Sequence, residues 1–240
     1  MPTAGIAIIG NEILSGKFAD ENTPWLVQRL RALGCDLQRV AVIVDTVEAI
    51  AEEVAAQSSR YDWVFTTGGV GPTHDDVTFE GVATAFGVPV HHHPELVEIL
   101  HRKMGAGCNE AALQMARVPV GCELWWDGGV TYPLIVMRNV CIFPGVPSLL
   151  KLKFDKVAHR FEGIRLATAR LVTHRAEQEI AAALTEASNR WPSVAIGSYP
   201  RLDETPFVVI VTLESRDITA LDDCMAWLMR SAPLAPCPSE

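Results

Sequence analysis

The stretch Thr66–Thr78, with the sequence TTGGVGPTHDDVT, is the part of this chain that decides the fold. It follows the apolar run Trp63-Val64-Phe65, which is typical of a buried parallel strand. It leads into residues 79–86, where apolar side chains recur at helical spacing. The pattern therefore predicts a strand, a glycine-rich loop and a helix. Open α/β sheets bind their ligands at such loops, at the carboxyl ends of the strands.

The residue types in this loop favour a phosphate site. Because glycine has no Cβ, Gly68, Gly69 and Gly71 let the backbone approach a phosphate and turn N–H groups toward it. The carboxylates of Asp75 and Asp76 would repel a phosphate unless a cation or a proton lay between them. We interpret the loop as a nucleotide or pterin phosphate site with an acidic, metal-assisted centre. The alternative is a plain strand-to-helix turn in which one of the two aspartates is the N-cap.

The composition is that of an acidic globular protein with enough apolar residues for a large core. The chain has 240 residues, 49% of them hydrophobic, and a formal net charge of −9, which argues against binding to a nucleic-acid backbone. No apolar run approaches the roughly 20 residues that span a bilayer, and the N-terminus lacks the basic stretch of a secretory signal. The six cysteines have no C-x-x-C spacing and are expected to be reduced thiols. We expect a cytoplasmic protein without a nucleic-acid or membrane partner.

Alternating strand and helix patterns predict a mostly parallel sheet in residues 1–163. Apolar strands are expected at 4–10, 37–44 and 63–67, and each precedes a helical pattern, as in right-handed βαβ units. Two apolar runs that flank Arg138-Asn139 predict a hairpin over 134–143, followed by a helix from residue 148. Gly163 is the predicted boundary of this domain. The predicted fold class is α/β, with helices on both faces of the sheet.

A second pattern follows the boundary. Strands at 166–172, 194–197 and 207–213, with helices at 176–189 and 218–229, predict a small α+β lobe over residues 164–232. The proline-rich residues 233–240 are expected to form a flexible tail.

Acidic residues follow three of the predicted strands. Glu12 follows the first strand, Asp45 the second and Asp76 the third. Because the carboxyl ends of parallel strands meet at one edge of a sheet, these acids are expected to converge, and together they could hold a hard cation through oxygen ligands. The alternative gives each acid a local role, as an N-cap at Asp45 and Asp20 and as a solvated loop residue at Glu12.

The turn FPGVP at residues 143–147 is a second candidate wall of a nucleotide pocket. Its alternative interpretation is a rigid connector with proline near a helix start. The chain has no G-x-G-x-x-G fingerprint, no P-loop lysine and no G-x-S-x-G elbow. Hydride transfer, kinase chemistry and serine hydrolysis therefore lack support in the sequence.

At these residues the chain resembles the molybdopterin-binding (MoaB/Mog-like) superfamily. Residues 66–80, TTGGVGPTHDDVTFE, are similar to the TTGGTG…DVTPE pattern of that family. The match is closer to the branch formed by CinA and by the molybdopterin-binding-like domain of eukaryotic FAD synthase. The GDE-L-G and GGLGPT-DD-T-E motifs of this branch correspond to residues 10–16 and 68–80. Residues 132–136, 138–140, 143–147 and 197–200 are similar to the FAD synthase version.

The resemblance implies a three-layer α/β/α domain that binds nucleotide or pterin phosphates, in a homo-oligomer. It implies catalytic and metal-binding roles for Asp45 and Asp76, with Mg or Co as the divalent metal and potassium as a further cation. With the loop analysis, the expected substrate-binding residues are Glu12, Asn22, Gly68, Gly69, Val70, Gly71, Thr73, Asp75, Thr78, Pro144 and Gly145. Two residues depart from the family pattern: Asn11 replaces the acid of GDE, and Val70 replaces threonine or leucine.

Three functions are open at this point. The first is metal-dependent hydrolysis of a dinucleotide pyrophosphate, FAD or ADP-ribose. The second is a molybdopterin adenylyltransferase of molybdenum cofactor biosynthesis. The third is a nucleotide- or pterin-binding module without catalysis, for which Asn11 is the reason.

Overall fold

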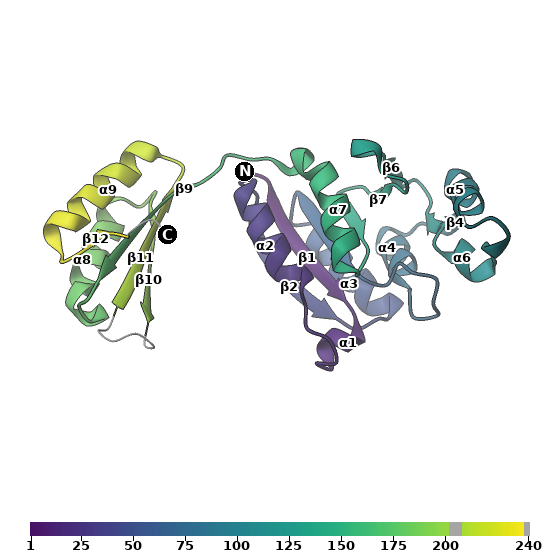
Figure 1. The fold of residues 1–240 in the computed structure, drawn as a ribbon, viewed down its shortest axis with the longest axis horizontal. Helices are drawn as coiled ribbons and strands as arrows, with labels where there is room; N and C mark the ends of the chain where they lie inside the picture. Colours follow the sequence, from purple (N-terminus) through teal and green to yellow (C-terminus); the bar gives the residue numbers. More distant parts are fainter. Residues whose placement is uncertain (202–207, 238–240) are drawn as a thin grey trace. The chain divides into compact units, whose positions relative to one another are not determined.

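The computed structural model describes residues 1–201 and 208–237, and the chain divides at Gly163 into two compact units, Met1–Gly163 and Ile164–Glu240 (Figure 1). Two core clusters lie entirely within the first unit, and a third lies entirely within the second. Among the described residues, no helix is both long and apolar enough to cross a membrane.

The first unit carries the strand–helix alternation that the sequence predicts. Its elements are β1 Thr3–Ile9, α1 Asn11–Leu14, α2 Asn22–Ala32, β2 Asp36–Ile43, α3 Val47–Ser58, β3 Trp63–Thr67, α4 Thr78–Phe86, β4 Val90–His92, α5 Pro94–Met104, η1 Gly105–Gly107, α6 Glu110–Gln114, β5 Arg117–Pro119, β6 Glu123–Trp125, η2 Asp127–Gly129, β7 Leu134–Met137, β8 Val140–Phe143, α7 Pro147–Val157 and η3 Ala158–Phe161.

The main sheet has six strands in the order β2-β1-β3-β8-β7-β6. The pairs β1/β2, β1/β3 and β3/β8 are parallel, whereas β7/β8 and β6/β7 are antiparallel. β1 lies between two parallel partners and is buried from Ala4 to Ile9, which explains its continuous apolar sequence. The predicted mostly parallel sheet and the predicted hairpin are confirmed.

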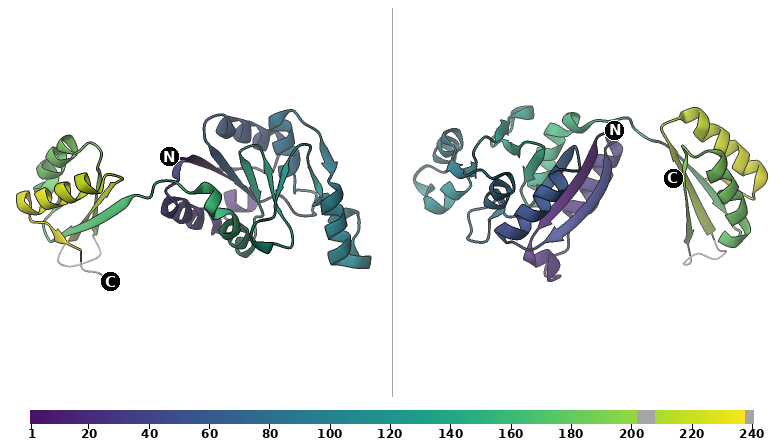
Figure 2. Two further views of the ribbon diagram at one scale, coloured as in Figure 1. Left: turned by 90° about the horizontal axis from the view of Figure 1, so that it is seen from above. Right: turned by 180° about the vertical axis from the view of Figure 1, so that it is seen from behind.

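Helices cover both faces of this sheet (Figure 2). On one face, α2 and α7 pack Leu30 and Phe154 against Phe65 in one core cluster. On the other face, α3 and α4 contribute Ile50 and Val82 to the second cluster, which α5 extends. The two clusters complete the three-layer α/β/α arrangement and leave the strand ends at the carboxyl edge for loops.

The second unit is the predicted small α+β lobe. Its elements are β9 Ala167–Thr173, α8 Glu177–Arg190, β10 Ala195–Arg201, β11 Val208–Ser215, α9 Ile218–Ser231 and β12 Ala235–Pro236. The strands form an antiparallel sheet in the order β10-β11-β9-β12. Side chains of α8 and α9, such as Ile180 and Leu228, pack with Val211 of the sheet in the third core cluster.

The expectation of a flexible tail from residue 233 is wrong for its first part. Ala235 and Pro236 pair with Val172 and Leu171, and the backbone N–H of Cys237 donates to the carbonyl of Arg170. The buried side chain of Leu234 anchors the segment in the core of the unit. Residues 238–240, and residue 207 of the strand expected at 207–213, lie outside the described residues.

The turn between β7 and β8 is fastened to the end of α3 by one side chain. The amide of Asn139 donates to the carbonyls of Ser58 and Tyr61 at 3.0 and 2.9 Å, and accepts from the Ser58 hydroxyl at 2.6 Å. We expect Asn139→Ala to destabilise the protein by about 2 kcal/mol, because it leaves partly buried carbonyls without donors. Denaturant unfolding followed by circular dichroism measures the change.

Ser58→Ala is the matched control because it removes only the hydroxyl bond. A cost below about 1 kcal/mol is expected for it. Equal costs for the two variants would contradict the assignment of Asn139 as the fastening residue.

Candidate functional site

The loops that follow β1, β2, β3 and β8 meet at one edge of the sheet. The backbone N–H of Asn11 donates to Asp45 Oδ2 at 3.1 Å, which joins the loop after β1 to the loop after β2. A Cβ placed on Gly145, after β8, would lie 3.2 Å from the Cα of Gly68, after β3. The convergence predicted from the parallel strands is thus present in the backbone itself.

The glycine loop is held in a conformation that glycine favours. Gly68 and Gly69 have φ angles of 103° and 61°. A Cβ on Gly68 would lie 2.1 Å from the carbonyl oxygen of Ile9, and one on Gly69 would lie 2.4 Å from Thr78 Oγ1. The loop is closed by Thr78, whose fully buried hydroxyl donates to the carbonyl of Gly68 at 2.8 Å. Thr78 therefore holds the backbone of the loop from the buried side.

Three consecutive N–H groups of this loop are left free. Within residues 1–201 and 208–237, no hydrogen bond uses the N–H of Gly69, Val70 or Gly71 as donor. Adjacent backbone donors of this kind, near residues of positive φ, form concave sites for anions. The arrangement can accept phosphate oxygens without a side chain.

The two aspartates of the loop have different surroundings, and neither is the N-cap of α4. Asp76 Oδ2 accepts hydrogen bonds from the backbone N–H and the hydroxyl of Thr73, which tightens the loop. Asp75 is exposed. The N-cap position is taken by Val77, which has no capping side chain. The assignment of Asp75 or Asp76 as the N-cap is therefore wrong.

Asp45 has an unusual environment for a carboxylate. Its Oδ1 is buried and has no hydrogen-bond partner among the described residues. Burial raises the pKa of the Asp45 carboxyl above its usual value, the N–H of Asn11 opposes this, and the charges of Glu12, Asp75 and Asp76 raise it further. The alternative role of Asp45 as an N-cap is excluded, because Thr46 caps α3.

A cleft of about 540 Å³ lies beside the glycine loop. Its lining includes five of the predicted site residues, namely Glu12, Asn22, Gly68, Asp75 and Gly145. Asn22 is buried and ties two walls together, because its amide donates to Thr67 Oγ1 at 3.0 Å and to the carbonyl of Gly145 at 2.7 Å. The carbonyl oxygen of the same amide is buried without a partner among the described residues. Asp20 holds the start of α2, by accepting from the N–H groups of Asn22 and Thr23.

The remaining predicted residues lie around the cleft or in a neighbouring cavity. Asp45, Gly69, Gly71, Thr73, Asp76 and Thr78 shape its surroundings without lining it, whereas Val70 and Pro144 line the second cavity. Among the described residues, no three His, Cys, Asp or Glu side chains are grouped as a metal site. The predicted convergence of Glu12, Asp45 and Asp76 is thus a shared electrostatic field and not a preformed three-ligand centre.

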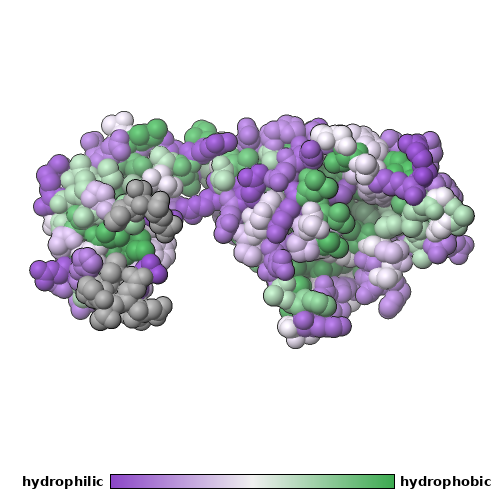
Figure 3. Space-filling model, in the orientation of Figure 1, coloured by the Kyte–Doolittle hydropathy of each residue, from purple (hydrophilic) through white to green (hydrophobic). Residues whose placement is uncertain are grey.

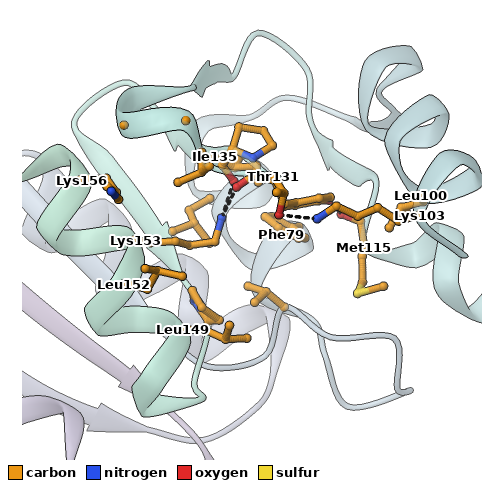
Figure 4. A pocket seen from close by; sticks show the side chains of 18 of the residues that line it. Phe79, Leu100, Lys103, Met115, Thr131, Ile135, Leu149, Leu152, Lys153 and Lys156 are labelled. Atoms are coloured by element: carbon orange, nitrogen blue, oxygen red, sulfur yellow. Dashed lines mark hydrogen bonds between the residues drawn. The ribbon is translucent and has the colours of Figure 1, made fainter.

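The second cavity was not predicted from the sequence. It has a volume of about 570 Å³ and is walled by apolar side chains and three lysines (Figure 4). The residues that line it come from α4, α5, η2, β7, β8, α7 and the loops between them. No single stretch of sequence therefore predicts the cavity. The one sequence signal is the pair Lys153 and Lys156, at i and i+3 of α7, beside the apolar Leu149 and Leu152.

Comparison with known proteins agrees with this architecture. The family model "Probable molybdopterin binding domain" matches residues 5–162, and the model "FAD synthase, middle domain" matches residues 165–237. A protein of Archaeoglobus fulgidus is 35% identical over 212 residues, which cover 88% of this chain and 90% of the relative. The crystal structure of CinA from Thermoplasma acidophilum has a TM-score of 0.61 and 27% identity, and covers 67% of this chain and 99% of that chain.

A "Probable FAD synthase" of Caenorhabditis briggsae is 33% identical over 248 residues. The match covers 92% of this chain and 47% of the relative, so the chain spans about half the length of that protein. The resemblance to the branch of CinA and FAD synthase is confirmed. The chain belongs to the family of the probable molybdopterin binding domain over residues 5–162, and its residues 165–237 match the model of the FAD synthase middle domain.

Proposed function

We propose that this chain binds the phosphates of a dinucleotide pyrophosphate, FAD or ADP-ribose, and hydrolyses the anhydride with the help of a divalent cation. The observation that carries the proposal is the set of three free N–H groups at Gly69, Val70 and Gly71, beside an acidic cleft. Backbone donors at the carboxyl edge of a parallel sheet are suited to a phosphate.

The acids explain why a cation is part of the proposal. Burial raises the pKa of Asp45, and the negative charges of Glu12, Asp75 and Asp76 raise it further. A pyrophosphate that entered this field would be repelled unless positive charge were bound with it. The chain's own residues fit that requirement: Asp45 keeps one carboxylate oxygen unpartnered, and Asp76 uses only Oδ2 for Thr73.

Asp45 and Asp76 would hold the cation together with phosphate oxygens of the substrate, a donor set in which Mg²⁺ is commonly bound. Such an ion offsets charge on the phosphates and lowers the pKa of water. The free N–H groups of the glycine loop would bind oxygens of the phosphate under attack, whose charge grows as the reaction proceeds. In the overall reaction, a water oxygen bonds to one phosphorus, the bridging P–O bond breaks and two monophosphates leave.

Two other functions are compatible with the same loop. The match to a probable molybdopterin binding domain favours an adenylyltransferase, which would join AMP to a pterin phosphate. Asn11, in place of the acid of GDE, favours a binding module without turnover. Product analysis separates the three: hydrolysis releases AMP from FAD or ADP-ribose without a pterin, transfer requires one, and a module only binds.

The acids should act together in catalysis. We expect Asp45→Asn and Asp76→Asn each to remove most turnover of the best substrate in a panel of nucleotide pyrophosphates, assayed with Mg²⁺ or Co²⁺, with and without potassium. Asparagine can accept the same hydrogen bonds but lacks the charge that a hard cation needs. The double variant should be little worse than either single variant, because residues that act as a unit are non-additive.

Asp62→Asn is the matched control. Asp62 Oδ2 accepts from the N–H and the hydroxyl of Thr3, the same pair of bonds that Asp76 makes with Thr73, but it lies before β3. Its replacement should leave turnover unchanged. Turnover rates near wild type in both Asp45→Asn and Asp76→Asn would contradict the metal-centred mechanism and favour the binding module without catalysis.

The pKa of Asp45 predicts how stability depends on pH. Since the folded-state pKa of Asp45 is raised, ionisation of this group opposes folding. Asp45→Asn should therefore match or exceed the melting temperature of wild type at pH 7, and this gain should vanish below about pH 4, where the carboxyl is protonated in both states. A divalent cation should raise the melting temperature of wild type and not that of the variant.

Asp62→Asn should behave in the opposite way. Hydrogen bonds from Thr3 lower the pKa of Asp62, so its ionised form favours folding. This variant should be less stable than wild type at pH 7, with the difference lost as the pH falls through the lowered pKa. Calorimetric melting curves between pH 3 and pH 7 test both statements. A loss of stability in Asp45→Asn at pH 7 would show that Asp45 is a structural residue.

A further inference from the structure

The second cavity is lined by positive charges, although the chain as a whole has a net charge of −9. Its described lining contains Lys103, Lys153 and Lys156 and no Asp or Glu side chain. Figure 4 shows the lysines reaching it from two sides, Lys103 from α5 and the other two from α7. Positive groups without a carboxylate partner in an acidic protein form a local site for an anion.

The lysines are held in place without being neutralised. Lys153 Nζ donates to the carbonyls of Tyr132 and Pro133 at 2.8 and 2.7 Å, and Lys103 Nζ donates to the Thr131 hydroxyl at 2.7 Å. Burial, and then the charge of Lys103, lower the pKa of Lys153 to about 8. An ammonium group has three donors, so Lys153 keeps one N–H for a ligand.

Lys156 is the free member of the group. It makes no hydrogen bond or ion pair with any residue in the described ranges, and it lies at the cavity beside Gly128. A Cβ on Gly128 would meet Lys156 Cδ at 2.4 Å, so the absence of a side chain there makes room for the lysine stem. Its charge is available at the cavity without any bond being broken.

The other walls are apolar and partly open. Phe79, Leu100, Met115, Ile135, Leu149 and Leu152 line the cavity. Leu149 and Leu152 are 47% and 55% exposed, and Figure 3 shows apolar surface in a hollow of the first unit. A volume of about 570 Å³ is in the range of pockets that enclose whole organic ligands. A sugar would leave these walls in contact with polar hydroxyls, whereas a planar ring system would cover them.

The glycine loop borders both the cavity and the acidic cleft. Val70, which carries one of the free N–H groups, and Pro144, which precedes Gly145, both line it, while Gly68 and Gly145 line the acidic cleft. A ligand with a phosphate on the loop can therefore extend into the cavity.

We propose that this cavity binds a polycyclic aromatic ring joined to a phosphate, with Lys103, Lys153 and Lys156 as the cation set and the apolar walls as the ring site. The inference deepens the proposed function and rests on it for the step that joins the cavity to the cleft. It assigns the ring-bearing half of the substrate to the cavity. A flavin mononucleotide unit then fits better than a ribose 5-phosphate unit, and better than the smaller ring of AMP.

Calorimetric titration of the full chain with FMN, AMP and ribose 5-phosphate, in the presence of a chelator, tests the proposal. FMN should bind at least tenfold more tightly than either of the others. Lys156→Met keeps an apolar stem and loses the charge, and should weaken FMN binding roughly fivefold, the upper range of a solvent-exposed ion pair. Its effect on the binding of ribose 5-phosphate should be of similar size, because the lost charge acts on the phosphate that both ligands carry.

Lys151→Met is the matched control, on the same helix but outside the cavity lining, and should change neither affinity. Melting temperatures of both variants should equal that of wild type, since neither lysine has a hydrogen-bond or ion-pair partner within residues 1–201 and 208–237. Equal affinities of FMN and ribose 5-phosphate, tighter binding of AMP than of FMN, or unchanged FMN binding in Lys156→Met would each overturn the proposal.

The two proposals fail separately. FMN binding that depends on Lys156, in a chain without pyrophosphate turnover, would refute hydrolysis and support the cavity. Turnover of ADP-ribose with no preference for FMN would refute the cavity and support hydrolysis.

Discussion

The site depends on a close approach of backbone to backbone. Gly68 lies so near the carbonyl of Ile9 that a Cβ would be 2.1 Å from its oxygen, and Gly145 approaches Gly68 almost as closely. Three strand ends are thereby packed without side chains between them. The positive φ of Gly68 and Gly69 then turns the chain so that the next N–H groups have no partner among the residues that the structure describes. Thr78 and Asn22 fix this geometry through buried hydrogen bonds.

Charge is divided across this loop. Glu12 and Asp75 line the cleft on one side, and Lys153 and Lys156 line the cavity on the other. A ligand bound across the glycine loop would place its phosphate between opposite fields. In such an arrangement, a cation is needed only on the acidic side, since the lysines offset phosphate charge on the other. Under the two proposals, this division of charge would orient an asymmetric ligand.

Much of the fold could be predicted from the sequence, because most of its strands, helices and turns are encoded by residues close together along the chain. The apolar run of β1 predicts a strand with neighbours on both sides, and three glycines in the loop after β3 predict close backbone contact. Other features depend on packing that no local pattern encodes. Lys103 and Lys153 meet only because α5 and α7 lie at the same cavity. The strand β12 forms because β9 offers a free edge, which outweighs the turn signal of the proline-rich tail.

Local structure does not account for the carboxylate at position 45. Thr46 already caps α3, and an asparagine could accept the hydrogen bond from Asn11 without a charge. One buried oxygen of the ionised group has no partner among the described residues. Burial and the charges of neighbouring acids raise the pKa of Asp45, so its charge opposes folding at neutral pH. In the proposed function, the charge of Asp45 acts in the bound state and not in folding. At this edge of the sheet, beside the free N–H groups of the glycine loop, it would hold positive charge next to a bound phosphate.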